Sequence, residues 1–282
     1  MPEIGKKLSS PQSWAQIFED KSFKSDFEEL ILPEYVQACR WFAGKSSTIK
    51  QVRIQTVLPV AAGSVGFYIL ILEVQFKESF SHQYLLPISF IYQLSELEEI
   101  ESQAICRMVA DTTDGFIYDA LYVSAFREMI FENILKNKIV HPDIGSIKFE
   151  KADSFSVKST KKIDSHILKA EQSNTAVIYN DQYFFKWYRR VFPESNPDLE
   201  ISRYLNQNHF NHTAQYCGGI SWNRPNKPPI SFGLLQQKLA NEGDSWNWML
   251  DEVNRFFIQL DKDPKGSFNY HANEKLFEPI KP

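Results

Sequence analysis

The 282-residue sequence lacks the features that mark secreted and membrane proteins. Its three cysteines, Cys39, Cys106 and Cys217, are widely separated and odd in number, which excludes a disulfide framework and fits a reducing compartment. The N-terminus has no apolar segment of the kind that a signal peptide needs. The apolar run at residues 57–72 is interrupted by one proline and two glycines and is too short to cross a bilayer. The sequence therefore predicts a cytoplasmic protein with no membrane partner.

Basic clusters and glycine-rich phosphate loops are equally scarce. The net charge is −4, and basic residues form no cluster larger than pairs such as Lys161-Lys162 and Arg189-Arg190, which argues against a nucleic-acid partner. Gly44-Lys45-Ser46 resembles part of a P-loop, but Cys39 stands where that motif requires its first glycine. The predicted order of helix before and strand after is also the reverse of the P-loop order. We therefore exclude a P-loop.

The sequence also shows no complete set of catalytic or metal-binding residues. His209, His212 and Cys217 lack the second ligand pair that structural zinc sites use. The His141-Pro-Asp143 segment precedes Lys186, whereas the catalytic loop of a kinase follows the nucleotide-binding part of the chain. No serine or cysteine nucleophile has a supporting motif. We predict no catalytic residue and no metal ligand in this chain.

What is present is the composition of an ordinary globular α+β chain. Hydrophobic residues make up 43%, and 14% are aromatic, which predicts a core built on large rings. In the first half, periodicity predicts helical structure, a meander of three antiparallel strands and a further helix; these lie at 11–39, then 49–58, 66–76 and 83–93, then 122–138. Residues 95–113 read as polar and mixed, and 141–162 as a linker.

The second half alternates strands with two helices. Strands are predicted at 177–179 and 183–188 around an Asn180-Asp181 hairpin turn. Ser195, Asn196 and Pro197 predict the start of a helix. Two more strands and a helix follow, at 216–222, 230–239 and 245–260, and the remaining tail has no periodic pattern. These elements predict three parts, which cover residues 1–140, 141–240 and 241–282.

One lysine stands out in this pattern. Lys186 lies in an aromatic strand, and Glu200 follows 14 positions later, one turn into the predicted helix. Such a pair places an ammonium group on nucleotide phosphates in kinase-like enzymes. From spacing alone, an exposed pair on the surface is the commoner explanation. The polar turn from Glu171 to Asn174 favours the functional interpretation, because its backbone N–H groups and the Ser173 hydroxyl are suited to phosphate oxygens.

Taken together, five stretches resemble one family, the bacterial maltokinases, which are ATP-dependent sugar kinases related to aminoglycoside phosphotransferases and often fused to trehalose synthase. Residues 32–45, with Leu32-Pro33-x-Tyr35 and Arg40-Trp41-Phe42-Ala43-Gly44-Lys45, resemble the signature of that family's N-terminal cap. The other four stretches resemble its phosphate loop, lysine strand, glutamate helix, and hinge with the following helix; they lie at 171–175, 185–190, 196–200, and 236–246.

This resemblance implies a kinase-like small lobe behind the cap, with specific roles for its residues. Lys186 contacts the nucleotide phosphates and is held by Glu200. Gln172, Ser173 and Asn174 cap the phosphates, and backbone groups near Gln237 and Leu239 bind adenine. The implied ligands are ATP with Mg²⁺, and the implied reaction converts maltose to maltose 1-phosphate. Trehalose synthase is the implied protein partner.

The chain also departs from the family pattern. Ala170 replaces a glycine that commonly precedes the phosphate loop. The His-Gly-Asp segment of the catalytic loop and the acidic metal ligand do not follow the helix at 245–260. We therefore expect a truncated large lobe, metal ligands outside this chain, and little or no activity for the chain alone. Two alternatives stay open, namely a non-catalytic kinase-like module associated with a trehalose synthase and a phosphotransferase for another small hydroxylated substrate.

Overall fold

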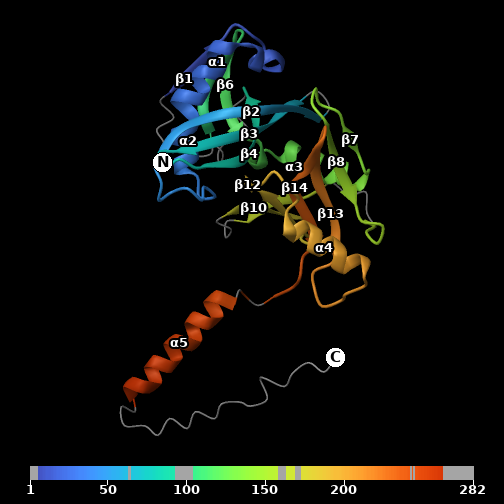
Figure 1. Cartoon of the computed structure of the whole chain (residues 1–282). Helices are drawn as coiled ribbons and strands as arrows, with labels where there is room; N and C mark the ends of the chain where they lie inside the picture. Colours follow the sequence, from blue (N-terminus) through green and yellow to red (C-terminus); the bar gives the residue numbers. More distant parts are fainter. Residues whose placement is uncertain are drawn as a thin grey trace. The chain divides into compact units, whose positions relative to one another are not determined.

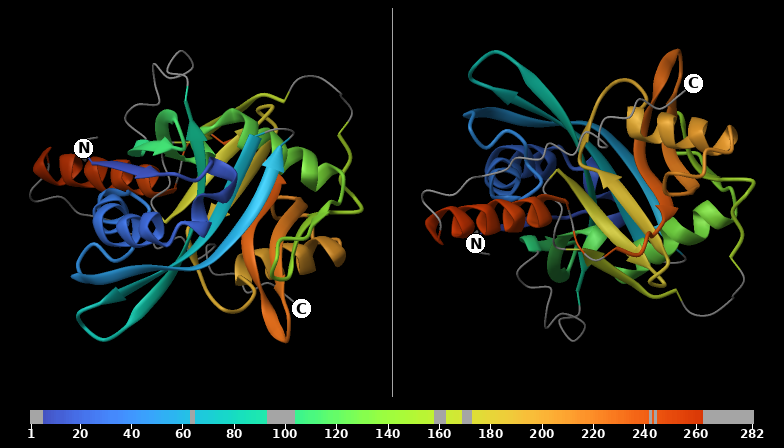
Figure 2. Two further views of the ribbon diagram at one scale, coloured as in Figure 1. Left: turned by 90° about the horizontal axis from the view of Figure 1, so that it is seen from above. Right: turned by 90° about the horizontal axis from the view of Figure 1, so that it is seen from below.

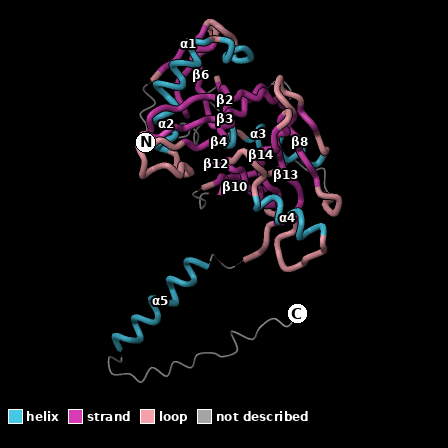
Figure 3. The backbone as a smooth tube through the Cα atoms, in the orientation of Figure 1, coloured by secondary structure: helices cyan, strands magenta, loops and turns pink. Residues whose placement is uncertain are grey.

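A computed structural model describes residues 6–62, 65–92, 104–157, 163–168, 173–241, 243 and 245–262 (Figure 1). The fold is mixed α+β, as the sequence predicts. Strands dominate the described residues up to Lys238 (Figure 3), and they form two seven-stranded sheets. Residues 1–238 make up one compact unit, and residues 239–282 make up a second.

The first sheet contains the predicted meander. Its order is β1-β5-β6-β4-β3-β2, with β12 paired beside β4, and every pair is antiparallel except β1 with β5. Its strands are β1 (Lys7–Ser10), β2 (Ile49–Ala62), β3 (Val65–Phe76), β4 (Ser81–Ile91), β5 (Ala104–Ala110), β6 (Thr113–Asp119) and β12 (Arg190–Val191).

The second sheet carries the predicted lysine strand. Its order is β7-β8-β13-β14-β11-β10-β9, and all its described pairs are antiparallel. Its strands are β7 (Ile139–Val140), β8 (Ser146–Lys151), β9 (Ser165–Leu168), β10 (Asn174–Tyr179), β11 (Tyr183–Tyr188), β13 (Tyr216–Arg224) and β14 (Lys227–Gln237). The lysine strand β11 therefore has a neighbour on both sides.

Both faces of the first sheet are buried, which explains the nearly continuous apolar sequence of β3. Phe67, Ile69 and Ile71 belong to the core that the first sheet shares with the second sheet. The alternate residues Leu70 and Leu72 belong to a separate core under the N-terminal helices. Because side chains of a strand alternate between faces, one run of apolar residues fills two cores.

Four short helical segments cover the face of the first sheet that carries Leu70 and Leu72. They are the 3₁₀-helix η1 (Trp14–Glu19), α1 (Lys21–Asp26), the π-helical turn η2 (Phe27–Ile31) and α2 (Leu32–Ala38). Residues 11–39 are therefore largely helical, as predicted, but not one continuous helix. Asp20 interrupts them, since its carboxylate accepts hydrogen bonds from the backbone N–H groups of Ser22 and Phe23 and starts a new helix.

The two sheets share the other core through helix α3 (Ser124–Leu135). Phe126, Ile130 and Ile134 are buried in it beside residues of β2, β3, β8 and β13, and the helix predicted at 122–138 is confirmed. In Figure 2 the strands of the two sheets are seen from above and from below. Along the sequence, the strands before residue 139 belong to the first sheet, and most of the later strands belong to the second sheet. The two sheets share one core. The predicted division at 140 and 240 stays a prediction.

Several strands lie where the sequence predicted none, and β5 and β8 are two of them. β5 falls inside the segment 95–113, and β8 falls inside the segment 141–162 that was taken as a linker. In β8, Ile147 and Phe149 are fully buried, while Lys148 and Glu150 point the other way and pair with each other at 2.6 Å. Two apolar residues among charged ones are too short a signal, and only pairing with β13 makes this segment a strand.

The hairpin and helix around the lysine strand agree with prediction. Asn180 and Asp181 have φ angles of 51° and 54°, as the turn of a tight hairpin requires. Helix α4 (Pro197–Gln207) begins after Asn196, whose side chain accepts a hydrogen bond from the backbone N–H of Asp198. The helix contacts β13 and β14.

The second unit contains one described helix, α5 (Ser245–Lys262), at the position predicted for 245–260. Several large apolar side chains on it, including Trp246, Trp248 and Phe257, are exposed. None of the helices among the described residues is both long enough and apolar enough to cross a membrane. The predicted tail from 263 onward lies outside the described residues.

We predict that the three thiols are protected from reagents in the folded chain. Cys106 and Cys217 are buried and Cys39 is partly buried, and burial raises the pKa of each thiol to about 12. The thiolate is the reactive form, so almost none is present at pH 8. Titration with a disulfide reagent at pH 8 should detect three thiols in denaturant and fewer than one in native protein. Rapid reaction of the native chain would contradict the burial of these residues.

Candidate functional site

Lys186 lies in the middle of the second sheet. It is opposite Ala176 of β10 on one side and Leu234 of β14 on the other. Its sequence neighbours Phe185 and Trp187 are buried in the shared core. The Lys186 side chain itself is 22% exposed, so its ammonium group lies near the surface while its stem is covered. A lysine this well covered requires a partner for its charge.

The partner is Asp198 and not Glu200. Lys186 Nζ lies 2.7 Å from Asp198 Oδ2, and the hydroxyl of Tyr188 donates to the same oxygen at 3.4 Å. Glu200 is exposed, and its charge acts on Arg203. Burial is the largest influence on the pKa of Arg203 and lowers it, but Tyr216, Glu150 and Glu200 together raise it. The predicted pairing of Lys186 with Glu200 is therefore wrong in this structure.

Helix geometry explains which carboxylate faces the lysine. Successive residues of an α-helix are rotated by about 100°, so Asp198 and Glu200 point in nearly opposite directions. Asp198 shares its side of the helix with Ser202, one turn further on, and Ser202 is buried against the sheet. The side of the helix that carries Asp198 is therefore turned inward, and Glu200 is turned to solvent.

Several contacts hold α4 in this orientation. The backbone N–H of Asn196 donates to Ser231 Oγ of β14 at 2.9 Å, and Gln236 Nε2 donates to Ser202 Oγ at 3.2 Å. Leu199 packs directly over Gly219 of β13, where an added Cβ would lie 2.6 Å from Leu199 Cδ1. The missing side chain at this position lets the helix approach the sheet closely, which fixes Asp198 over the lysine strand.

The predicted phosphate loop is described only at its end. Gln172 lies outside the described residues. Ser173 is exposed just before β10, and its Oγ accepts a hydrogen bond from Asn174 Nδ2 at 3.4 Å. Asn174 is opposite Tyr188, two residues along β11 from Lys186. At about 3.3 Å per residue, this places the end of the loop roughly 7 Å along the strand from the lysine.

Gln237, one of the two predicted adenine contacts, lies at the other end of β11. Gln237 is the last residue of β14 and is opposite Tyr183, which is three residues or about 10 Å from Lys186. The backbone N–H of Gln237 donates to Gln215 O at 2.9 Å and is therefore already used within the protein. Leu239 is exposed and begins the second unit. Its carbonyl oxygen accepts a hydrogen bond from Asn241 Nδ2 at 3.3 Å.

Along β11 the structure thus places three features in order. These are the end of the predicted phosphate loop beside Tyr188, the paired ammonium group of Lys186, and the end of β14 beside Tyr183. An ammonium group held at a fixed position suits the oxygens of a phosphate, because a positioned cation neutralises their charge. In the part of the chain that the structure describes, no three His, Cys, Asp or Glu side chains gather to hold a metal ion. The implied Mg²⁺ stays a prediction.

Sequence reasoning missed a fully buried cation three residues beyond Lys186. Arg189 is fully buried, and its Nη2 lies 2.5 Å from Asp119 Oδ2 at the end of β6. Its Nε donates to Thr175 Oγ1 at 2.8 Å, and its guanidinium carbon lies 4.8 Å from the centre of the Trp41 ring. Tyr35 also donates to Asp119 Oδ2, at 3.4 Å.

This cluster gives the cap signature a structural role. Tyr35 and Trp41 belong to the stretch 32–45, Asp119 is the last residue of β6 in the first sheet, and Arg189 directly follows the lysine strand β11 of the second sheet. The signature residues therefore hold the end of the strand that carries Lys186. The sequence held one signal of this, since Arg189 directly follows a strand of aromatic residues, but its charged partner Asp119 is 70 residues away.

A comparison with protein families supports the cap assignment. Residues 35–122 match the family model described as the maltokinase N-terminal cap domain. The match begins at Tyr35 and includes Trp41 and Asp119, the three cap residues that contact Arg189 or its partner. The matched segment lies within the N-terminal half of the chain and supports a maltokinase-like kinase.

Solved structures of a glucosamine kinase in two crystal forms are similar to this chain. Each is 13% identical to it, and the TM-scores are 0.45 and 0.42. The similarity covers 79% of this chain but only 44% and 45% of the kinase chains. This chain thus spans less than half the length of the solved structures that it matches.

Proposed function

We propose that this chain is the cap and nucleotide-binding portion of a maltokinase-type sugar kinase. The observation that carries the proposal is the Lys186–Asp198 pair beside the β10–β11 hairpin. In this proposal, Asp198 takes the role that the family resemblance implied for Glu200. Lys186 binds the phosphates of ATP, and Ser173 and Asn174 lie beside them. The match of residues 35–122 to the cap domain supports the family.

The protein's contribution to such a transfer is positioning and charge neutralisation. A lysine whose carboxylate partner lies on a helix anchored to the sheet keeps its ammonium group in one place, so little ordering remains to be done when a nucleotide binds. Mg²⁺ bound with ATP would add further neutralisation of the phosphate charge. The proposed acceptor is the 1-hydroxyl of maltose, and the product is maltose 1-phosphate.

Calorimetric titration of the chain with ATP, ADP and AMP in the presence of Mg²⁺ tests the proposal. Because Lys186 is proposed to meet phosphates, we expect affinity to fall from ATP to AMP by at least tenfold. We expect no maltose 1-phosphate from the chain with ATP, Mg²⁺ and maltose, because the sequence has no His-Gly-Asp segment.

Two outcomes would contradict the proposal. Equal binding of ATP and AMP would mean that Lys186 does not meet phosphates. No saturable nucleotide binding at all would favour the alternative of a non-catalytic module. Formation of maltose 1-phosphate by this chain would leave the nucleotide site standing and overturn the expected inactivity.

A further inference from the structure

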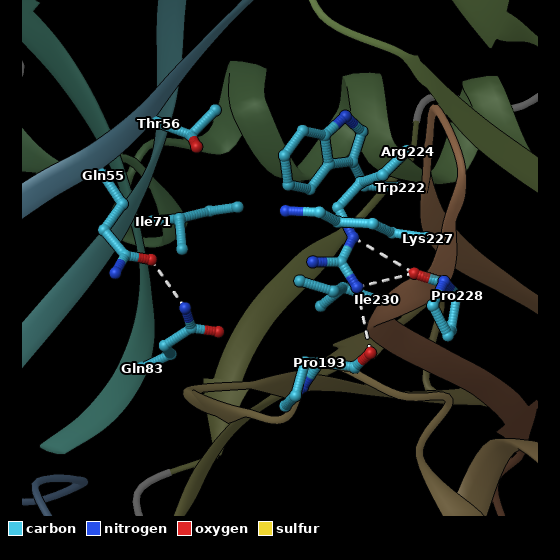
Figure 4. Close-up of a pocket in the computed structure, with 10 residues that line it drawn as sticks. All are labelled: Gln55, Thr56, Ile71, Gln83, Pro193, Trp222, Arg224, Lys227, Pro228 and Ile230. Carbon is cyan, nitrogen blue, oxygen red and sulfur yellow. Dashed lines mark hydrogen bonds between the residues drawn. The ribbon is translucent and has the colours of Figure 1, made fainter. Parts of the chain in front are cut away.

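A pocket of about 620 Å³ lies between the two sheets, away from the residues predicted to bind nucleotide (Figure 4). One wall comes from β2, β3 and β4, with Gln55, Thr56 and Gln83 among its residues. The other wall comes from β13 and β14 and includes Trp222 and Arg224. Its volume is within the range of about 300–1,000 Å³ that small-molecule sites have.

The pocket has a positively charged side. Arg224 and Lys227 both line it, and none of its ten lining residues is acidic. Figure 4 shows the Lys227 ammonium group pointing into the space between the two walls. Exposed lysines elsewhere on a surface are common, but here a guanidinium group lies beside the ammonium group. Two neighbouring cations with no acid among the lining residues favour an anionic ligand.

The guanidinium group of Arg224 is held rigidly. Its Nε donates to Pro228 O at 3.1 Å, and its Nη2 donates to Pro228 O at 2.6 Å and to Pro193 O at 2.9 Å. Its third nitrogen, Nη1, takes part in none of these bonds and points toward the pocket in Figure 4. Since the group is already positioned, binding an anion there costs little conformational entropy.

The rest of the lining suits a sugar better than a bare anion. Trp222 is buried, and its Nε1 donates to Ile144 O at 2.9 Å, which fixes an indole ring as part of the wall. Gln83 Nε2 donates to Gln55 Oε1 at 2.5 Å, while Gln83 Oε1 is buried and has no hydrogen-bond partner among the described residues. A ring with several hydroxyl groups could pack on the indole and donate to this wall.

We propose that this pocket binds a phosphorylated sugar, with the phosphate on Arg224 and Lys227 and the sugar ring between Trp222 and the glutamines. The pocket lies between the first sheet and the second sheet, so a bound ligand stabilises one arrangement of the two sheets. The choice of sugar phosphate rests on the proposed function, because phosphoryl transfer to maltose yields one. The site is thus suited to sensing the product of the reaction.

Calorimetric titration of the whole chain with maltose 1-phosphate tests this inference. We expect saturable binding, and we expect Lys227→Gln to weaken it at least tenfold. Lys77→Gln is the control. It removes an exposed lysine between β3 and β4 that does not line the pocket, and it should leave the affinity unchanged. Lys186→Met should also leave it unchanged, because Lys186 does not line the pocket.

Titrations with two further ligands show whether the sugar and the phosphate both contribute to binding. Maltose and inorganic phosphate should each bind at least tenfold more weakly than maltose 1-phosphate. Equal binding of inorganic phosphate would overturn the sugar part of the proposal. No saturable binding, no effect of Lys227→Gln, or an equal loss with Lys186→Met would overturn the site. Sugar-phosphate binding without nucleotide binding would leave this site standing while the proposed function fails.

Discussion

Asp119→Asn is expected to lower the free energy of unfolding by about 3–5 kcal/mol, which is the cost of leaving one charge of a buried pair without its partner. Asp119 and Arg189 are both fully buried, and the shortest distance between their charged groups is 2.5 Å. The asparagine retains an oxygen for the backbone N–H of Leu121, which Asp119 now accepts at 3.1 Å. The loss therefore comes from the uncompensated guanidinium group. Urea denaturation followed by circular dichroism measures it.

The same strand offers a matched control. Asp114 of β6 pairs with Arg107 at 2.6 Å, but both side chains are about half exposed. Asp114→Asn should therefore change stability far less than Asp119→Asn. If the two substitutions have similar effects, Asp119 does not carry a buried charge interaction.

A double substitution separates the pair from its surroundings. Burial is the largest influence on Asp119 and raises the pKa of its carboxyl group, against the opposing effect of Arg189. Burial therefore disfavours the ionised form of the Asp119 carboxyl group. The free energy of unfolding should fall as the pH rises from the ordinary pKa of this group through its raised pKa in the folded chain. Replacing both charges, with Asp119→Leu and Arg189→Met, should restore most of the stability lost in the single variant.

Lys186→Met is expected to weaken ATP binding by at least tenfold, because it removes the ammonium group proposed to meet the phosphates. Asp198→Asn should weaken binding in the same direction, since it frees the ammonium group from the position that the 2.7 Å contact now holds. Glu200→Gln changes a carboxylate two residues away on the same helix and should leave the affinity unchanged. Calorimetric titration with ATP and Mg²⁺ compares the three.

This comparison decides between the two carboxylates. Loss of affinity with Glu200→Gln and none with Asp198→Asn would restore the pairing predicted from the sequence and contradict the structure. Lys148→Met provides a control for the lysine, because Lys148 is also on the second sheet and also pairs with a carboxylate, Glu150. A similar loss with Lys148→Met would mean that the effect on binding is one of general charge.

Sequence reasoning succeeded where the signal is local. Runs of β-favouring residues predicted β2, β3 and β4, and the Asn180-Asp181 dipeptide predicted the hairpin before Lys186. The cap at Asn196 predicted the start of α4. Local rules placed Lys186 in a strand and put a carboxylate-bearing helix after it. They failed for β8, whose two buried residues become a strand only by pairing with β13.

The sequence by itself thus determined the meander of β2, β3 and β4, the hairpin before Lys186, and that a lysine strand precedes an acidic helix. Only the tertiary structure decided that Asp198 meets Lys186, because the rotation of α4 depends on the contacts of Leu199 and Ser202 with distant strands. It likewise decided that Asp119, Tyr35 and Trp41 surround Arg189. These residues are far apart along the chain, and no local pattern records a contact that arises only when two sheets bury a common core.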